Sequence, residues 1–245
     1  MERRWTVPRC AALCQARDGT AHSHSPLWLT EVARPVGLQI TPGVFYRDWC
    51  LLSLDGTCLD VADTPANVTA FGRPGASRGN AVGAFPQVRL VGLAECGTHA
   101  LLQVALGPYT MSERRLADRL IPNLPVGALV LADRGLYSFE RWQRAAATGA
   151  ALCWRVSMRM RLPQDVVLED GSYHSRLYAF SDRHRHQTSM VVRVVEYQLD
   201  DPGRPGQTEG YRLLTNVLEP AAAPAPELAA VYGAEDHLKL PRPDH

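Results

Sequence analysis

The stretches WCLLSLDGT (residues 49–57) and GALVLADRG (residues 127–135) decide the fold. Each is a short apolar run that ends in an aspartate, which is followed by a glycine-containing turn signal. Short continuous apolar runs bounded by turn residues are typical of buried strands. We therefore expect two buried strands in an α/β sheet, ending at Asp55 and Asp133.

Further strand and helix patterns surround these two runs. The segments 87–96 and 100–109 have the composition of a pair of strands, and 151–157 has that of another buried strand. Helices are expected at 112–120 and 138–149, since each begins with a serine at the N-cap position. The order of strands and helices predicts an α/β core. After residue 158 the chain becomes β-rich, and a Pro/Ala linker at 219–227 leads into a last helical pattern.

Length and composition indicate a globular protein with a sizeable core. The chain has 245 residues, of which 46% are hydrophobic and 21% charged. It contains no apolar run of the roughly 18–20 residues that a membrane helix needs, and its first ten residues lack the apolar segment of a secretory signal. We expect a cytoplasmic protein with no membrane partner. Cys10 and Cys14, followed by His22 and His24, form an irregular zinc pattern, but free thiols explain the cysteines better.

Charge is unevenly distributed along the chain. The formal net charge is +1, yet residues 111–193 carry a net +5 and residues 194–245 a net −5. Arginine supplies 25 of the 26 basic residues, and Lys239 is the other one. A positive middle section predicts a face that binds a polyanion, although an ordinary solvated surface explains the same pattern.

Asp55 and Asp133 are the candidate functional residues. Strand ends line the ligand clefts of open α/β sheets, and two carboxylates on adjacent strands suit divalent cations that prefer oxygen ligands. Each aspartate is also explained as an ordinary turn or cap residue. From the residues alone, both interpretations stay open.

Three segments resemble a known family. They are LDGTCLDVADTPANVTAFGRP (54–74), QVRLVGLAECGTHALLQVALGPY (87–109) and LVLADRGLYSFERWQRAAATGA (129–150), and they resemble the DDE transposases of bacterial insertion sequences, in the insertion sequence four family. The resemblance runs from about Phe45 to Tyr232. It implies an RNase H-like mixed-sheet core, interrupted by a β-rich insertion, in which Asp55 and Asp133 are the first two of three carboxylates that hold two Mg²⁺ (or Mn²⁺) ions.

The resemblance also implies function and domain organisation. The implied activity is metal-dependent DNA cleavage and strand transfer in transposition, on double-stranded DNA at transposon ends and target, with a homodimer in the synaptic complex and association with the nucleoid. The expected parts are a remnant of an N-terminal region (1–44), the catalytic core (45–158), the β-rich insertion (159–218), and a linker with the start of the final core helix (219–245).

Further DNA contacts are expected around this core. Arg134, beside Asp133, is a candidate phosphate contact, and Tyr232 matches the tyrosine of the family's final-helix motif. The basic loop Arg73–Arg78 and the tract DRHRH (182–186) are weaker candidates for contact with the DNA backbone.

The third carboxylate departs from the family pattern. Counting on from Tyr232, the family's arginine falls at Glu235 and its glutamate at Lys239, and Pro241 stops a continuing helix. Glu235 or Asp236 could substitute only from about one helical turn away. The sequence therefore predicts a catalytically impaired transposase, truncated or frameshifted after residue 232. The alternatives are a non-catalytic DNA-binding relic and a product that does not fold stably.

Overall fold

A computed structural model describes residues 33–75, 83, 85–179, 189–200 and 208–236. Several sequence features lie outside these residues: the cysteine and histidine pattern at 10–24, the tract at 182–186, the end of the basic loop beyond Gly75, and Lys239. Within the described residues, no helix is long and apolar enough to cross a membrane.

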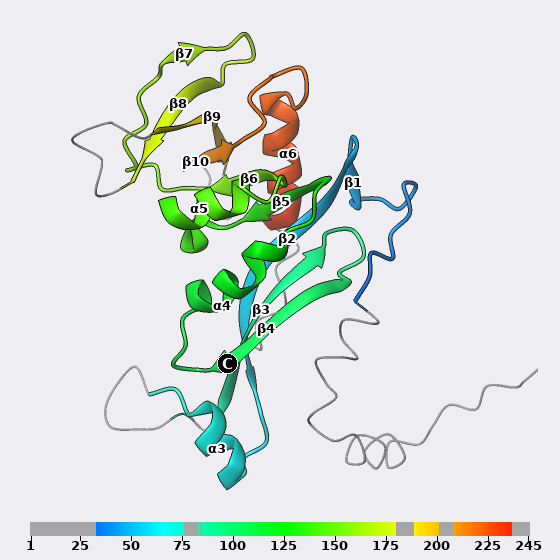
Figure 1. Cartoon of the computed structure of the whole chain (residues 1–245), viewed down its shortest axis with the longest axis vertical. Helices are drawn as coiled ribbons and strands as arrows, with labels where there is room; N and C mark the ends of the chain where they lie inside the picture. The colour runs from blue at the N-terminus through cyan, green and yellow to red at the C-terminus, as the bar shows by residue number, and fades with distance from the viewer. Residues whose placement is uncertain (1–32, 76–82, 84, 180–188, 201–207, 237–245) are drawn as a thin grey trace, which may run out of the picture.

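A continuous mixed sheet of ten strands organises the described part of the chain (Figure 1). The strand order is β4-β3-β2-β5-β6-β10-β9-β8-β7, and β1 pairs with β2. The strands are β1 (Phe45–Tyr46), β2 (Trp49–Asp60), β3 (Gln87–Glu95), β4 (Leu101–Pro108), β5 (Ala128–Ala132), β6 (Ala151–Arg155), β7 (Val166–Val167), β8 (Tyr173–Tyr178), β9 (Ser189–Asp200) and β10 (Thr208–Thr215). The helices are α3 (Pro65–Phe71), α4 (Glu113–Leu120), α5 (Phe139–Ala146) and α6 (Ala225–Asp236), with 3₁₀ turns η1 (Ile121–Asn123) and η2 (Arg134–Leu136).

The first part of this sheet has RNase H-like topology. β2, β3 and β4 form an antiparallel meander, and β5 and β6 run parallel to β2 on its other side. α4 lies in the connection from β4 to β5, and α5 in the connection from β5 to β6. The serine caps expected for both helices are present, since Ser112 Oγ accepts from Arg115 N–H and Ser138 Oγ from Arg141 N–H. The expected fold class is therefore confirmed.

The β-rich segment extends the core sheet. β10 pairs antiparallel with β6, so that Leu213 lies opposite Arg155, and β9, β8 and β7 follow outward. The strands between residues 159 and 218 thus continue the hydrogen-bonded ladder of the RNase H-like half of the sheet. The division of the chain into domains at 158 and 218 stays a prediction.

The prediction that Asp55 ends its strand is wrong. β2 continues to Asp60, because its antiparallel pairing with β3 runs on through Gly56↔Val91 to Asp60↔Gln87. This ladder satisfies the backbone groups that an Asp-Gly turn would leave unpaired. Asp133 does follow the end of β5, as expected.

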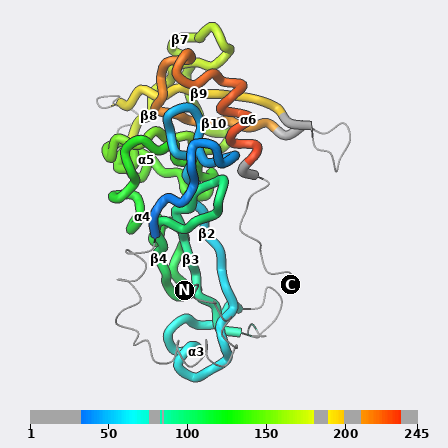
Figure 2. The backbone as a smooth tube through the Cα atoms, turned by 90° about the vertical axis from the view of Figure 1, so that its right-hand side faces the viewer, coloured from blue at the N-terminus to red at the C-terminus, as the bar shows by residue number. Residues whose placement is uncertain are grey.

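A short helix precedes the expected basic loop Arg73–Arg78. This helix, α3, ends at Phe71; Thr64 Oγ1 caps Asn67 N–H at its start, and Pro65 occupies the first turn. Figure 2 shows α3 at the far end of the long β2, β3 and β4 strands, away from α6.

Helices cover both faces of the sheet. Leu116 of α4 and Trp142 of α5 pack on one face, in a cluster with Leu52 and Leu54 of β2. Leu228 and Tyr232 of α6 pack on the other face, with Leu51 of β2 and Leu129 of β5. Because side chains alternate along a strand, Asp55 lies in phase with Leu51 and therefore on the α6 face.

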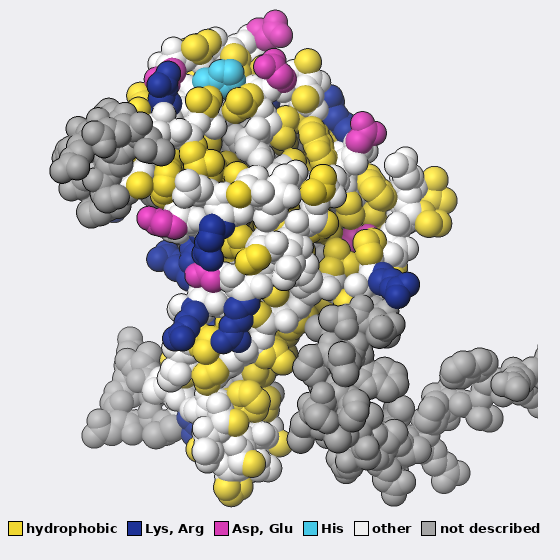
Figure 3. Space-filling model, viewed as in Figure 1, with side chains coloured by type: hydrophobic (Ala, Val, Ile, Leu, Met, Phe, Trp, Pro, Cys, Tyr) yellow, Lys and Arg dark blue, Asp and Glu magenta, His cyan; other side chains and the backbone are white. Residues whose placement is uncertain are grey.

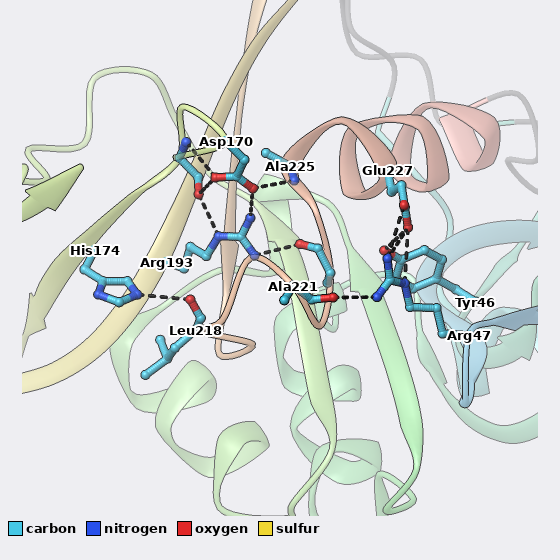
Figure 4. Close-up of polar contacts among 11 residues, drawn as sticks. Tyr46, Arg47, Asp170, His174, Arg193, Leu218, Ala221, Ala225 and Glu227 are labelled. Carbon is cyan, nitrogen blue, oxygen red and sulfur yellow. Dashed lines mark hydrogen bonds and ion pairs between the residues drawn. The ribbon is translucent and has the colours of Figure 1, made fainter. Parts of the chain in front are cut away.

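A buried ion pair holds the start of α6 (Figure 4). Arg193 of β9 is fully buried and pairs with Asp170, in the turn before β8. Arg193 also donates to Ser172 Oγ and to the Ala223 carbonyl, each at 2.7 Å. Asp170 Oδ2 accepts from the backbone N–H of Ala225, the first residue of α6, at 2.8 Å. The turn at Asp170 therefore satisfies a helix N–H that would otherwise lack a partner.

A second contact holds α6 from the β1 side. Glu227 Oε2 accepts from Tyr46 Oη at 2.7 Å and from Arg47 Nη2 at 3.1 Å, and Arg47 Nη1 donates to the Ala221 carbonyl at 2.7 Å (Figure 4). Burial, together with the hydrogen bond to Glu227, raises the pKa of Tyr46 to about 12, so the hydroxyl remains a donor. Elements distant in sequence thus fix the helix over the sheet.

We expect Asp170→Asn to lower the free energy of unfolding at pH 7 by about 3 kcal/mol, because it leaves the buried Arg193 without its counter-charge. Urea denaturation measures this loss. The matched control is Asp165→Asn, which breaks the exposed pair with Arg176 and should cost less than about 1 kcal/mol. Equal losses in the two variants would contradict the assigned role of Asp170.

The same pair gives a pH dependence. Burial alone would raise the pKa of Asp170, but hydrogen bonds from Ser172 and Ala225 and the charge of Arg193 outweigh it and lower the pKa below the ordinary 3.8. Since the folded-state pKa is the lower one, the stabilisation is complete above pH 3.8 and is lost as the pH falls through the folded-state pKa. We expect the stability difference between the parent chain and Asp170→Asn, followed by urea denaturation, to shrink only below about pH 4. A difference that shrinks nearer neutral pH would contradict this assignment.

Candidate active site

The structure brings Asp55 and Asp133 side by side. β2 and β5 are parallel neighbours, and their register ends with Leu54 opposite Ala132. The next residue on each chain is an aspartate, and the backbone of Asp133 is still extended, with φ −78° and ψ 161°. Adjacent strands lie about 4.8 Å apart, and residues in register point to the same face. Both carboxylates therefore belong to the face that α6 covers.

Asp133 lies where its strand gives way to η2. Its Oδ1 accepts from the backbone N–H of Arg134 at 2.7 Å, and its side chain is 46% exposed. The aspartate is thus also the cap residue that the ordinary interpretation of its motif predicts. This cap fixes the carboxylate at the edge of the sheet and leaves it accessible to solvent.

Arg155 lies beside these two aspartates, on a third parallel strand. Trp154 of β6 pairs with Ala132, so Arg155 is in register with Asp133. Its Nη1 lies 4.0 Å from Asp133 Oδ1, and its guanidinium lies 4.0 Å from the ring centroid of Tyr211 on β10. The Arg155 side chain is only 12% exposed. Asp55, Asp133 and Arg155 form what we call the strand-end row.

Sequence reasoning missed Arg155, although a signal for it was present. The run ALCWRVS (151–157) is a third short apolar strand, and its first charged residue occupies the place that aspartate has in the other two. Recognising its partner requires the β5–β6 register, which only the fold supplies.

Tyr232 and Arg134 both lie close to Asp133, but Tyr232 is buried and Arg134 is exposed. Tyr232 is 3% exposed, and its hydroxyl donates to the carbonyl of Ala132 at 3.3 Å. This contact places α6 directly against the end of β5. Arg134 is exposed in η2. The DNA contacts expected of these two residues stay predictions.

A third carboxylate does not join the row in the part of the chain that the structure describes. There, no group of three or more His, Cys, Asp or Glu residues is placed to hold a metal ion. α6 extends to Asp236, so positions 235 and 236 fall one helical turn beyond Tyr232. Asp55 and Asp133 are thus the carboxylates that the described residues bring together at the site.

Comparisons with known proteins agree with the sequence resemblance. The chain is 33% identical over 197 residues to the transposase InsG of insertion sequence element IS4 from Escherichia coli K12, a match that covers 78% of this chain and 43% of InsG. It is 32% identical over 88 residues to the putative transposase InsZ of the same organism, covering 36% of this chain and 29% of InsZ. The chain therefore spans less than half the length of these curated relatives. No protein-family model matches it.

Solved structures give only distant matches. A piggyBac transposase synaptic complex with hairpin DNA matches 77% of this chain and 40% of its own, with 10% identity and a TM-score of 0.41. Endonuclease V from Bacillus subtilis matches 74% of this chain and 70% of its own, with 10% identity and a TM-score of 0.30. These scores are too low to support an argument about this chain. The sequence matches, together with the resemblance of its motifs, support a bacterial insertion-sequence transposase of the IS4 type.

Proposed function

We propose that this chain contains the catalytic core of a transposase that cleaves DNA phosphodiester bonds, with Asp55 and Asp133 as ligands of divalent cations and with impaired activity, because the third carboxylate of the family pattern is missing. The single observation that carries the proposal is the β2–β5 register, which sets the two aspartates next to each other on the α6 face. The similarity to insertion-sequence transposases supports the choice of DNA as substrate and of transposition as the process.

The donor atoms suit Mg²⁺ or Mn²⁺. Carboxylate oxygens are the ligands that these hard cations prefer, and the half-exposed side chain of Asp133 is accessible to an ion. When bound, a pair of such ions supplies activation of the attacking oxygen and neutralisation of the leaving one. Asp55 and Asp133 would hold these ions through their carboxylate oxygens.

Arg155 orients the phosphate that is to be cleaved. A guanidinium is a planar fork that binds two phosphate oxygens at once, and stacking on Tyr211 holds this fork in one orientation. Its register beside Asp133 places it next to the cation ligands. Tyr232 supports the site indirectly, because its hydroxyl fixes the backbone of Ala132 immediately before Asp133.

The same arrangement serves hydrolysis and strand transfer. The two reactions differ in whether water or a DNA 3′-hydroxyl attacks, while the phosphate and the groups around it stay the same. The partners are then double-stranded DNA at the transposon ends and at the target, bound by a homodimer in a synaptic complex at the nucleoid.

A non-catalytic DNA-binding protein is the second candidate. It is favoured by the finding that the described residues offer two clustered carboxylates and no third at the site. Such a protein would occupy transposon ends without cutting them. DNA binding with no cleavage under any of the metal conditions below would identify it.

We expect Asp133→Asn and Asp55→Asn each to lower the rate of DNA cleavage at least about 100-fold, because each removes a charged ligand from a preorganised site. Supercoiled plasmid carrying the element's ends is the substrate, and nicked and linear products are quantified. Asp60→Asn, on the same strand β2 but away from the site, is the matched control and should cleave at the parent rate. Unchanged cleavage by Asp133→Asn would refute the assignment.

Cleavage should require a divalent cation. We expect EDTA to abolish product formation, and Mg²⁺ or Mn²⁺ to restore it, because the carboxylates alone cannot neutralise the charge that develops on the phosphate. Binding of Mn²⁺ to the chain, followed by electron paramagnetic resonance, should weaken in Asp133→Asn and not in Asp60→Asn. Cleavage that persists in EDTA would contradict a metal-dependent reaction.

We expect Arg155→Lys to lower cleavage about tenfold or more and to leave Mn²⁺ binding unchanged, because lysine cannot offer the bidentate fork. A thermal melt within a few degrees of the parent would separate this effect from loss of the stacking on Tyr211. If Arg155→Lys cleaves at the parent rate, the role of the fork is excluded.

A further inference from the structure

A cluster of exposed arginines begins immediately beside Asp133. Arg134 follows this aspartate in the chain, and Arg114 of α4 donates from Nε to the carbonyl of Gly135 at 2.7 Å. Figure 3 shows basic side chains gathered over the region of α4 and α5. We call the five exposed arginines of this region the arginine ridge: Arg114, Arg115, Arg119, Arg134 and Arg144.

Helix geometry explains why the ridge faces outward. α4 buries Leu116, Ala117 and Leu120 against the sheet. With 3.6 residues per turn, position 115 then lies on the opposite side of the helix, and positions 114 and 119 lie on its two flanks. Arg119 Nη1 donates to the Leu106 carbonyl of β4 at 3.2 Å, so the ridge runs from η2 across α4 to the edge of the sheet.

The acidic residues nearby do not neutralise the ridge. Asp118, the one carboxylate on the outer face of α4, is shared between Arg141 and Arg144, and these two arginines outweigh the effect of burial and lower its pKa. Glu113 lies 3.9 Å from Arg89. Arg115 and Arg134 form no ion pair with any residue in the described parts of the chain. The ridge is therefore a positive surface with uncompensated charge.

The chemistry of the ridge suits phosphates. Guanidinium groups bind phosphate oxygens through paired N–H donors. Arg115 and Arg119 are one turn apart, about 6 Å along the helix axis, so they can contact neighbouring phosphates of one strand. Contacts of this kind position a duplex and do not read its sequence.

We propose that the arginine ridge binds the phosphate backbone of duplex DNA next to the cleavage site, independently of base sequence. This inference rests on the proposed DNA-cleaving function and adds the surface along which the duplex leaves the strand-end row. The ridge begins next to the row, because Arg134 follows Asp133 in the chain and Arg114 is hydrogen-bonded to the neighbouring Gly135.

The test measures binding of the full chain to two unrelated 30-base-pair duplexes by fluorescence anisotropy between 0.05 and 0.3 M salt. We expect Arg115→Gln with Arg119→Gln to weaken binding of both duplexes about tenfold near 0.1 M salt, and to reduce the slope of log K against log salt by about 1.8. Arg115→Gln alone should reduce the slope by about 0.9. Thermal melts confirm that the variants fold, which is expected since the side chains are exposed.

The control removes the same charge elsewhere. Arg159→Gln with Arg176→Gln replaces two other exposed arginines, one after β6 and one on β8, and should leave affinity and slope nearly unchanged. A ridge variant that binds as the parent does, or a control that loses as much, would overturn the inference. Tighter binding of a duplex RNA of equal length would overturn the choice of DNA.

Measuring DNA binding and DNA cleavage on the same chain separates this inference from the proposed function. Ridge-dependent DNA binding by a chain that never cleaves would uphold the ridge and refute the cleavage proposal. If the ridge variant binds and cleaves DNA as the parent chain does, the ridge is refuted and the cleavage proposal is upheld. A chain that neither binds nor cleaves DNA would refute both.

Discussion

The parallel pairing of β2 with β5 is the constraint on which the site depends. A register that sets Leu54 opposite Ala132 also sets Asp55 beside Asp133. A shift of one residue would turn one aspartate toward the face of α4 and α5, because side chains alternate along a strand. The apolar residues before each aspartate hold the register: Leu52, Leu54, Val130 and Ala132 are buried on one face, and Leu51, Leu129 and Leu131 on the other. Core packing thus fixes the distance between two carboxylates that would repel each other without a cation.

Local signals in the sequence were sufficient for the elements of the core. The apolar runs, the serine caps and the glycines predict β5, β6, α4 and α5 close to their observed bounds, and the family resemblance predicts their RNase H-like arrangement. The same reasoning failed at Asp55, since Asp-Gly is a turn signal only when the backbone lacks another partner. Here β3 provides that partner through residue 60. The turn propensity of two residues is small beside a ladder of backbone hydrogen bonds.

The sequence alone does not predict which residues that are far apart along the chain are in contact. Arg155 gains its place in the site only through the β5–β6 register, and nothing in the run ALCWRVS identifies Asp133 as its neighbour. The turn at Asp170-Gly171 is recognisable, but its contact with α6 depends on Arg193 and Ala225, which are 23 and 55 positions away. An arginine in the middle of a β-strand is expected to face solvent. Arg193 is instead fully buried, because Asp170, Ser172 and the Ala223 carbonyl satisfy its donors.

The β-rich segment therefore has a physical role in the core, whatever its further function. α6 packs on the sheet through Leu228 and Tyr232, and its first turn follows a Pro/Ala linker. Asp170 and Arg193, both from the β-rich segment, satisfy the Ala225 N–H and the Ala223 carbonyl at the point where the helix begins. Glu227 ties the same turn to β1. With its start fixed from two sides, the helix reaches the end of β5, where Tyr232 contacts the residue before Asp133. Displacing the turn at Asp170 would thus move the helix that packs on the same face of the sheet as both aspartates, which couples the outer strands of the sheet to the geometry of the strand-end row.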